Sequence, residues 1–267
     1  MMSVLRENAH DRELDDTVAQ IDALERPVPS VLRFTARLTQ GTENPNWLRP
    51  NTALRIQLGP EHDDVSRVYT VRSFDAASSS MVVDVVLHGG ESPMMRWVHG
   101  LQIGDTFALT GPRPHFLVPE SDAKAAIFAD DTAIPALFAM LQQWPSGREA
   151  IGWVATDDAE AFAELPDVDG VELHLIGKND SLAEQALRME SPAEHVVWGA
   201  GERDEMRAIR RFFRTTHGLG KDDVAVFGYW KKGVSTTVID DSRRRSYQRI
   251  LEAGGTLADI DDLEIGD

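Results

Sequence analysis

At the centre of its β-rich half, the chain reads Arg67-Val68-Tyr69-Thr70-Val71-Arg72. Successive side chains of a strand point to opposite faces, so Arg67, Tyr69 and Val71 are expected on one face. An aromatic ring near a guanidinium can stack on a flat heterocycle while the guanidinium holds a phosphate. Arginine and tyrosine are also common on an ordinary exposed strand face, so the residues alone leave both interpretations open.

Further strands are expected on both sides of this segment. Alternating or β-branched runs, bounded by Gly, Pro and Asp turns, predict strands over residues 31–38, 54–58, 68–71, 81–87 and 106–110. Short strands at this spacing are typical of a small antiparallel barrel, which we place at residues 27–118.

The second half of the chain, residues 119–267, has a different pattern. Apolar strand-like runs at 125–129, 150–154, 171–176, 195–200 and 224–228 alternate with helical runs, including 134–143, 181–189 and 202–215. Such alternation predicts a parallel sheet covered by helices on both faces. A C-terminal helix is expected at 243–253. The predicted fold is therefore a β-barrel followed by a Rossmann-like α/β domain, with a ligand at their junction.

The first 26 residues are expected to form a helical extension. Leu14, Val18, Ile21 and Leu24 recur at steps of four, three and three, which gives one apolar stripe, and prolines follow it. A docked helix or a lid is the interpretation that we favour, ahead of any direct role in chemistry.

Composition narrows the possible functions. The net charge of −17 disfavours nucleic acids and anionic membranes as partners, and anionic ligands would need a locally basic pocket. The absence of cysteine excludes disulfides, thiolate metal ligands and iron–sulfur clusters, so redox chemistry would require a bound cofactor. With no signal-peptide pattern and no long apolar run, we expect a cytoplasmic protein without membrane insertion.

A glycine turn follows the fourth predicted strand, in the sequence Leu87-His88-Gly89-Gly90-Glu91-Ser92-Pro93. Ser92 suits the N-cap and Pro93 the first position of a helix. Glycines allow the backbone to approach a ligand, and a helix N-terminus attracts anions. Taken alone this is a weak phosphate signal, and a lone His88 is more often structural than catalytic.

Several short segments, in order from residue 67 to residue 233, resemble the siderophore-interacting protein family, the ferric-siderophore reductases of the ferredoxin reductase-like group. Arg67–Arg72 matches the family's flavin signature R-x-Y-T-x-R. The strand V-L-H-G and the turn G-P-A-S-R-W-A correspond to Val86–Gly89 and Ser92–Trp97. The G-D, G-P-R, A-G-D-E-T-A-L-P-A, A-G-E and G-Y-W-R-x-G motifs correspond to Gly104-Asp105, Gly111–Arg113, Ala129–Ala136, Ala200–Glu202 and Gly228–Gly233.

The resemblance implies that the barrel binds FAD. Arg67 would pair with the flavin phosphates, Tyr69 would lie against the isoalloxazine ring, and Thr70 would bond near its redox-active edge. Backbone N–H groups of the turn at Met94 and Met95 would meet the pyrophosphate. The remaining flavin contacts implied by the resemblance are Val71, Val86, His88 and Gly89.

The resemblance also implies a nucleotide-binding domain that takes NADPH or NADH as the electron donor. Thr132 and Ala133 would lie where nicotinamide meets flavin, and the nucleotide side would be lined by Glu202, Arg207, Tyr229 and Trp230. The chemistry belongs to the cofactors, so no catalytic acid–base residue and no metal site is expected.

The implied electron acceptor is a ferric siderophore. Such complexes are usually anionic, and Lys231 and Lys232 are the candidate substrate residues because of their family position near the cleft. Arg243–Arg245 is a second basic group, for which a solvated helix start or an intersubunit ion pair is an equally good interpretation. The residues leave the oligomeric state open.

This chain departs from the family pattern in the phosphate turn, where Met94-Met95 replaces Ala-Ser, and at Ala129, which replaces Gly. Two alternatives therefore remain beside a flavin-dependent ferric-siderophore reductase. One is a non-catalytic siderophore-binding protein on the same scaffold. The other is a general flavin reductase or a ferredoxin-coupled reductase.

Overall fold

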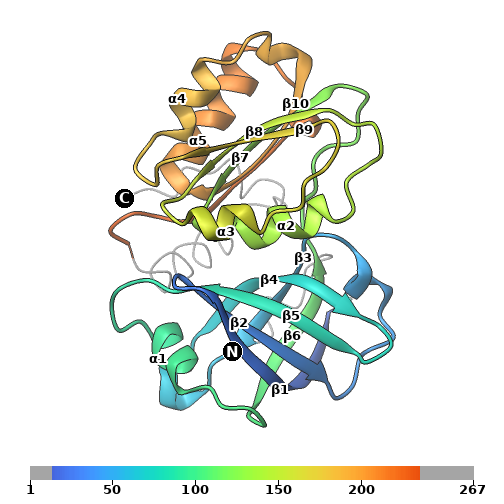
Figure 1. The fold of residues 1–267 in the computed structure, drawn as a ribbon, viewed down its shortest axis with the longest axis vertical. Helices are drawn as coiled ribbons and strands as arrows, with labels where there is room; N and C mark the ends of the chain where they lie inside the picture. The colour runs from blue at the N-terminus through green and yellow to red at the C-terminus, as the bar shows by residue number, and fades with distance from the viewer. Residues whose placement is uncertain (1–13, 235–267) are drawn as a thin grey trace, which may run out of the picture.

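The computed structural model describes residues 14–234, which form a closed barrel beneath a parallel sheet (Figure 1). The predicted fold class, an antiparallel barrel followed by a Rossmann-like domain, is confirmed. The helix expected at 243–253 and the basic group Arg243–Arg245 lie outside the described residues.

The barrel has six antiparallel strands in the order β1-β2-β5-β4-β3-β6, and pairing of β1 with β6 closes it. The strands are β1 (Asp15–Val28), β2 (Val31–Leu38), β3 (Thr52–Gln57), β4 (Ser66–Asp75), β5 (Ser80–Val86) and β6 (Thr106–Pro114). Between β5 and β6 lies helix α1 (Pro93–Gly100). Phe34, Phe107 and Trp97 of α1 meet edge to face in the core, so α1 is part of the barrel's hydrophobic packing.

The prediction of an N-terminal helix is wrong for its described part, because β1 starts at Asp15 and pairs with both β2 and β6. The cause is a register shift between Ile21 and Ala23. Before the shift Ala19 and Ile21 are buried in the barrel core, and after it Leu24 packs against the same core, whereas Val18 is 37% exposed. The bulge therefore produced the three-residue step from Ile21 to Leu24 that resembles part of a helical stripe. Residues 1–13 of the predicted extension lie outside the described range.

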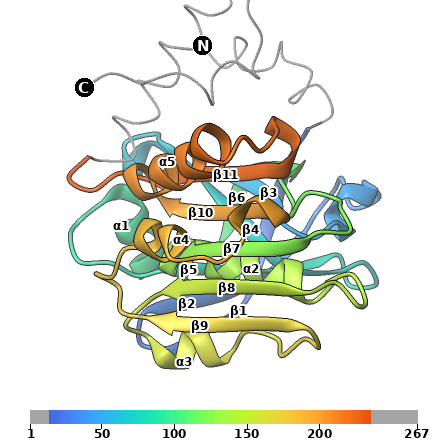
Figure 2. The same cartoon turned by 90° about the horizontal axis from the view of Figure 1, so that it is seen from above.

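The second domain is a five-stranded parallel sheet in the order β11-β10-β7-β8-β9 (Figure 2). Its elements are β7 (Lys124–Asp130), α2 (Ile134–Leu141), β8 (Ala150–Ala155), α3 (Ala159–Ala163), β9 (Val171–Ile176), α4 (Leu182–Leu187), β10 (His195–Glu202), α5 (Arg203–Arg211) and β11 (Val224–Trp230). Helices α2 and α3 lie between the sheet and the barrel, and α4 and α5 cover the opposite face (Figure 1). None of the helices within residues 14–234 is long and apolar enough to cross a membrane.

The chain runs outward from β7 in both directions, through β8 and β9 on one side and through β10 and β11 on the other. The strand order therefore reverses between β7 and β10. In open α/β sheets, ligands bind at the carboxyl ends of the strands at such a reversal. The sheet thus places the ends of β7 and β10, Asp130 and Glu202, at the position where a nucleotide is expected.

The two domains share one apolar cluster. Val28 and Val31, which flank the β1–β2 turn of the barrel, pack with buried residues of β7 and α2. The hydroxyl of Ser30 in the same turn donates to the Asp158 carboxylate at the start of α3. The junction is therefore packed along one side, and this packing fixes which faces of barrel and sheet meet.

Candidate active site

Strand β4 carries the first group of candidate residues, and it is the barrel strand that faces α2 (Figure 1). Arg67, Tyr69 and Thr70 are all half-buried, and Nη1 of Arg67 donates to the Ser66 carbonyl at 2.8 Å. Tyr69 packs against the barrel core, and its burial raises the pKa of the phenol above the usual value, although Arg67 opposes the shift. Tyr69 therefore offers a neutral hydroxyl group on a half-buried side chain.

The turn between β5 and α1 presents bare backbone. His88, Gly89 and Gly90 are exposed, and a Cβ built on either glycine would meet no atom within 4 Å. Gly90 has a φ of 110°, which an L side chain rarely adopts. The turn therefore has open space in front of its backbone, as a phosphate-binding turn requires.

The two methionines of the phosphate turn do not obstruct it. Met94 and Met95 are 3% and 1% exposed and belong to the barrel core. The N–H of Met95 donates to the Ser92 hydroxyl at 3.2 Å, so Ser92 caps α1 as expected. The departure from Ala-Ser thus changes the core beneath the turn, and the surface of the turn is left free of either side chain.

Two further candidates differ in what they can offer a ligand. Val71 is 4% exposed and its side chain lies in the barrel core, so only its backbone could meet a flavin. Val86, at the end of β5, is half-buried and lines a cavity of about 20 Å³ together with Asp131 and Ile134 of the other domain. The flavin-side strand ends and the start of α2 therefore adjoin each other.

Asp130, at the end of β7, joins two candidates that lie far apart in sequence. Its Oδ1 accepts from the N–H of Thr132 at 2.9 Å and from the Thr132 hydroxyl at 2.6 Å. Its Oδ2 accepts from Nε1 of Trp230 at 2.7 Å. Burial raises the pKa of the Asp130 carboxyl, and the bonds from Thr132 and Trp230 oppose that shift. Ala133, which follows Thr132, is fully buried and offers only backbone.

Gly201, at the end of β10, makes room for this carboxylate. A Cβ on Gly201 would lie 2.6 Å from Cγ of Asp130, and the glycine φ is 154°. Any other residue would therefore displace Asp130 and the two groups that it holds. Asp130 lies within the motif segment Ala129–Ala136 but was not among the predicted site residues. Its position at the end of a buried strand was the signal that could have identified it.

Glu202 serves first as a cap for α5. Its Oε2 accepts from the N–H groups of Asp204 and Glu205 at 2.7 and 3.1 Å, and its Oε1 accepts from the N–H of Lys232 at 3.1 Å. Through this last bond, the end of β10 holds the segment that carries the candidate substrate residues. Glu202 thus has its oxygens occupied by backbone donors of the protein itself.

The other candidates spread along the same edge of the sheet. Arg207 is exposed on α5, Lys232 is exposed, and Lys231 is half-buried and pairs with Val234 in an isolated bridge. Tyr229 packs on the cluster shared with α2, and burial raises the pKa of its hydroxyl. The structure therefore brings Thr132, Trp230, Glu202 and Lys232 together, with Arg207 further along α5.

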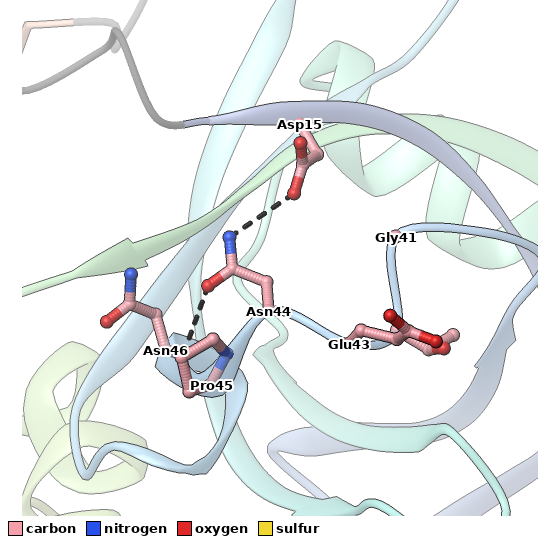
Figure 3. A pocket seen from close by; sticks show the side chains of 7 residues that line it. Asp15, Gly41, Glu43, Asn44, Pro45 and Asn46 are labelled. Carbon is pink, nitrogen blue, oxygen red and sulfur yellow. Dashed lines mark hydrogen bonds between the residues drawn. The ribbon is translucent and has the colours of Figure 1, made fainter.

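An open cavity of about 640 Å³ lies elsewhere, between the start of β1 and the segment after β2 (Figure 3). Its described lining consists of Asp15, Gly41, Thr42, Glu43, Asn44, Pro45 and Asn46. Nδ2 of Asn44 donates to the Asp15 carboxylate at 3.2 Å, as the dashed line in Figure 3 shows. Carboxylates and amides suit neither a flavin phosphate nor an anionic iron complex, so this cavity is not the candidate site.

The residues on β4 and in the following turn suit a flavin nucleotide. They supply a guanidinium, a half-buried aromatic side chain, a hydroxyl and open glycine backbone, which match phosphates, a flat ring system, a polar ring edge and a pyrophosphate. The observed surface therefore fits FAD.

Comparison with known proteins gives the same assignment. Residues 36–116 match the family model of the siderophore-interacting FAD-binding domain, and residues 123–233 match that of the siderophore-interacting protein. A ferric acinetobactin reductase from Acinetobacter baumannii is 36% identical, over 98% of this chain and 94% of that protein. A ferric vibriobactin reductase from Vibrio cholerae is 28% identical, over 69% of this chain and 71% of its own length.

A solved structure agrees with these matches. The siderophore-interacting protein from Acinetobacter baumannii superposes with a TM-score of 0.84 and 34% identity, covering 90% of this chain and 99% of that one. The chain therefore belongs to the siderophore-interacting protein family, and its barrel corresponds to the FAD-binding domain of that family.

Proposed function

We propose that this protein is a flavin-dependent ferric-siderophore reductase. When bound, FAD supplies the ability to take two electrons from a hydride donor and to pass them on one at a time. Overall, one NAD(P)H reduces two Fe(III) complexes to Fe(II), with formation of NAD(P)⁺ and release of one proton. Iron leaves because siderophores hold Fe(II) more weakly than Fe(III).

The observation that carries this proposal is the placement of Arg67, Tyr69 and Thr70 on the barrel strand that packs against the nucleotide domain. Arg67 would hold the flavin phosphates, with help from the open backbone of Gly89 and Gly90. Tyr69 would support the ring system, and Thr70 would donate near the polar edge of the ring.

The donor would occupy the carboxyl ends of β7 and β10, where the strand order reverses. Thr132 would face the nicotinamide, with its hydroxyl and its N–H already oriented by Asp130. NADPH and NADH both fit this proposal, and reduced ferredoxin is the alternative donor that a direct comparison would separate from them.

The acceptor would bind near Lys231 and Lys232. The chain as a whole has a net charge of −17 and repels anions. Two adjacent lysines beside the proposed nucleotide site would supply local positive charge that attracts an anionic iron complex. Trp230 lies beside them, held by Asp130, and would cover the cleft from solvent.

The test starts from the purified protein with FAD added. We expect a flavin absorption band and quenched flavin fluorescence, bleaching of the band by NADH or NADPH without oxygen, and its return when a ferric siderophore is added while an Fe(II) chelator develops colour. Absence of any bound-flavin signal would refute the proposal. Bound flavin with siderophore binding, but without oxidation of either nucleotide or of reduced ferredoxin, would favour the non-catalytic alternative.

A further inference from the structure

Arg72, the last residue of the segment that carries Arg67 and Tyr69, lies at a bulge of β4. Val71 pairs with Val83 of β5 and Ser73 pairs with Val82, so Arg72 has no partner position of its own. Val71 points into the barrel core, and Arg72 points outward on the opposite face of the strand, where the other domain buries it.

The Arg72 guanidinium contacts three elements. Its Nη1 lies 2.7 Å from Oδ2 of Asp84 on β5, and its Nη2 lies 3.3 Å from Oε2 of Glu164, which ends α3. Its Cζ lies 3.3 Å from the centroid of the Phe138 ring on α2. A planar cation that stacks on a ring and binds carboxylates at its edge holds all three in one arrangement.

Arg33 on β2 completes the group. Its Nε is 2.7 Å from Oδ1 of Asp84, and its Nη2 is 2.7 Å from Oε2 of Glu164. Asp84 is 4% exposed, Arg72 7% and Arg33 16%, so the two pairs with Asp84 are poorly screened by solvent, whereas Glu164 is 31% exposed and its pairs are partly screened. Because two cations face two anions, each charge is compensated, and loss of one partner leaves another buried and unpaired.

The position of Arg72 links the two halves of the proposed site. It follows Thr70 by two residues, and the helix that carries Phe138 starts immediately after Thr132 and Ala133. The cavity of about 20 Å³ beside it is lined by Arg72, Val86 and Asp131 among others and has room for about one water molecule.

We propose that Arg72 is a positioning residue that sets the separation and angle between the flavin-binding strand and the nicotinamide-binding segment. It is not itself a flavin ligand. This inference rests on the proposed function, and it assigns to the ion-pair group of Arg33, Arg72, Asp84 and Glu164 the role of a strut between the two binding surfaces. Hydride transfer depends steeply on such geometry.

The test compares the full-length protein with Arg72→Lys, Arg72→Met and Glu164→Gln. We expect the FAD dissociation constant to stay unchanged, while the rate of flavin reduction at saturating NAD(P)H falls about 10- to 100-fold. In the protein without FAD, we expect faster amide hydrogen exchange over residues 131–137. The lysine and glutamine variants keep the test available if Arg72→Met fails to fold.

Arg37→Met is the matched control, because Arg37 also lies on a barrel strand and pairs at 3.0 Å with Asp22 of the same domain, away from the junction. It should change none of the three measurements. If the Arg72 variants lose FAD affinity but keep the reduction rate once saturated, Arg72 is a flavin ligand and the proposal is overturned. If the unaltered protein takes up no FAD, the proposed function fails. In that case, unchanged amide hydrogen exchange over residues 131–137 in the Arg72 variants would independently overturn the positioning role of Arg72.

Discussion

Nε1 of Trp230 donates to Oδ2 of Asp130 at 2.7 Å, across 100 residues of chain. The bond ties β11 to β7, the last and the first strand of this domain in chain order, at the edge of the sheet where the nucleotide is proposed to bind. The other oxygen of the same carboxylate fixes Thr132. One buried side chain thereby orients a candidate from each end of the domain, Thr132 and Trp230.

Asp130→Asn should destabilise the protein by about 1–3 kcal/mol. The donors of Thr132 and Trp230 now use both carboxylate oxygens, and an asparagine side chain offers only one oxygen acceptor. Urea unfolding measures the change, and the fluorescence of Trp230 should shift with it. Asp131→Asn is the control: it breaks a half-exposed pair with Lys178 and should cost less than about 1 kcal/mol. Equal effects of the two substitutions would contradict the role given to Asp130.

Gly201→Ala should cost about 1–3 kcal/mol, because the new Cβ would overlap the Asp130 carboxylate. Thermal unfolding measures the loss. Gly100→Ala provides the comparison, since a Cβ there meets no atom within 4 Å and the backbone is not in a positive-φ region. A Gly201→Ala protein as stable as Gly100→Ala would show that the close approach of Gly201 to Asp130 is not needed.

Arg67→Ala should raise the FAD dissociation constant about 10- to 150-fold, the equivalent of about 1.5–3 kcal/mol for a lost charged hydrogen bond. Quenching of flavin fluorescence during titration gives the constant. Arg37→Ala removes the same charge from the barrel surface at a distance from the proposed site and should leave the affinity as it is. Unchanged affinity in Arg67→Ala would remove Arg67 from the phosphate site.

Lys231→Gln/Lys232→Gln should raise KM for an anionic ferric siderophore about 5- to 10-fold, since two nearby positive charges are lost. The rate of flavin reduction by NAD(P)H should not change, because the backbone bond from Lys232 to Glu202 is retained. An uncharged quinone acceptor serves as the control and should keep its KM. A rise in KM for both acceptors would point to a general distortion of the cleft.

Glu164 should make the free energy of unfolding measurably dependent on pH. The hydrogen bond from Arg33 lowers the pKa of Glu164 in the folded protein below its usual 4.5. Its contribution is therefore present above pH 4.5 and is lost as the pH falls through the folded pKa. The difference in unfolding free energy between wild type and Glu164→Gln should narrow in acid, as urea unfolding at several pH values would show.

Asp130 provides an internal check on that series. Burial raises the pKa of Asp130, so its contribution is largest in acid and is lost as the pH rises through the folded pKa. The difference between wild type and Asp130→Asn should therefore change with pH in the opposite direction. Parallel slopes for the two variants would contradict at least one of these assignments.

The sequence predicted the two-domain architecture because the strands of each domain differ in pattern. Alternating or β-branched runs mark the barrel, and apolar runs separated by helices mark the parallel sheet. It misassigned β1, because the bulge between Ile21 and Ala23 interrupts the alternation on which the prediction depends.

The candidate site was predictable only in part. Residues such as Arg67 and Tyr69 can be identified as candidates from their type and their spacing within one strand. Asp130 acts through donors at positions 132 and 230, and Arg72 acts through Asp84 and Glu164. Contacts between residues so distant in sequence follow from how strands and helices pack, which periodicity does not encode.

The turn between β1 and β2 has a consequence for recombining this protein with its relatives. Val28 and Val31 belong to the barrel by connectivity, yet they complete the apolar cluster under α2. A chimera joined in the segment between β6 and β7 would pair that cluster with a foreign turn and leave a void or a clash. Successful exchange of the nucleotide half therefore requires transplanting the matching turn residues with it.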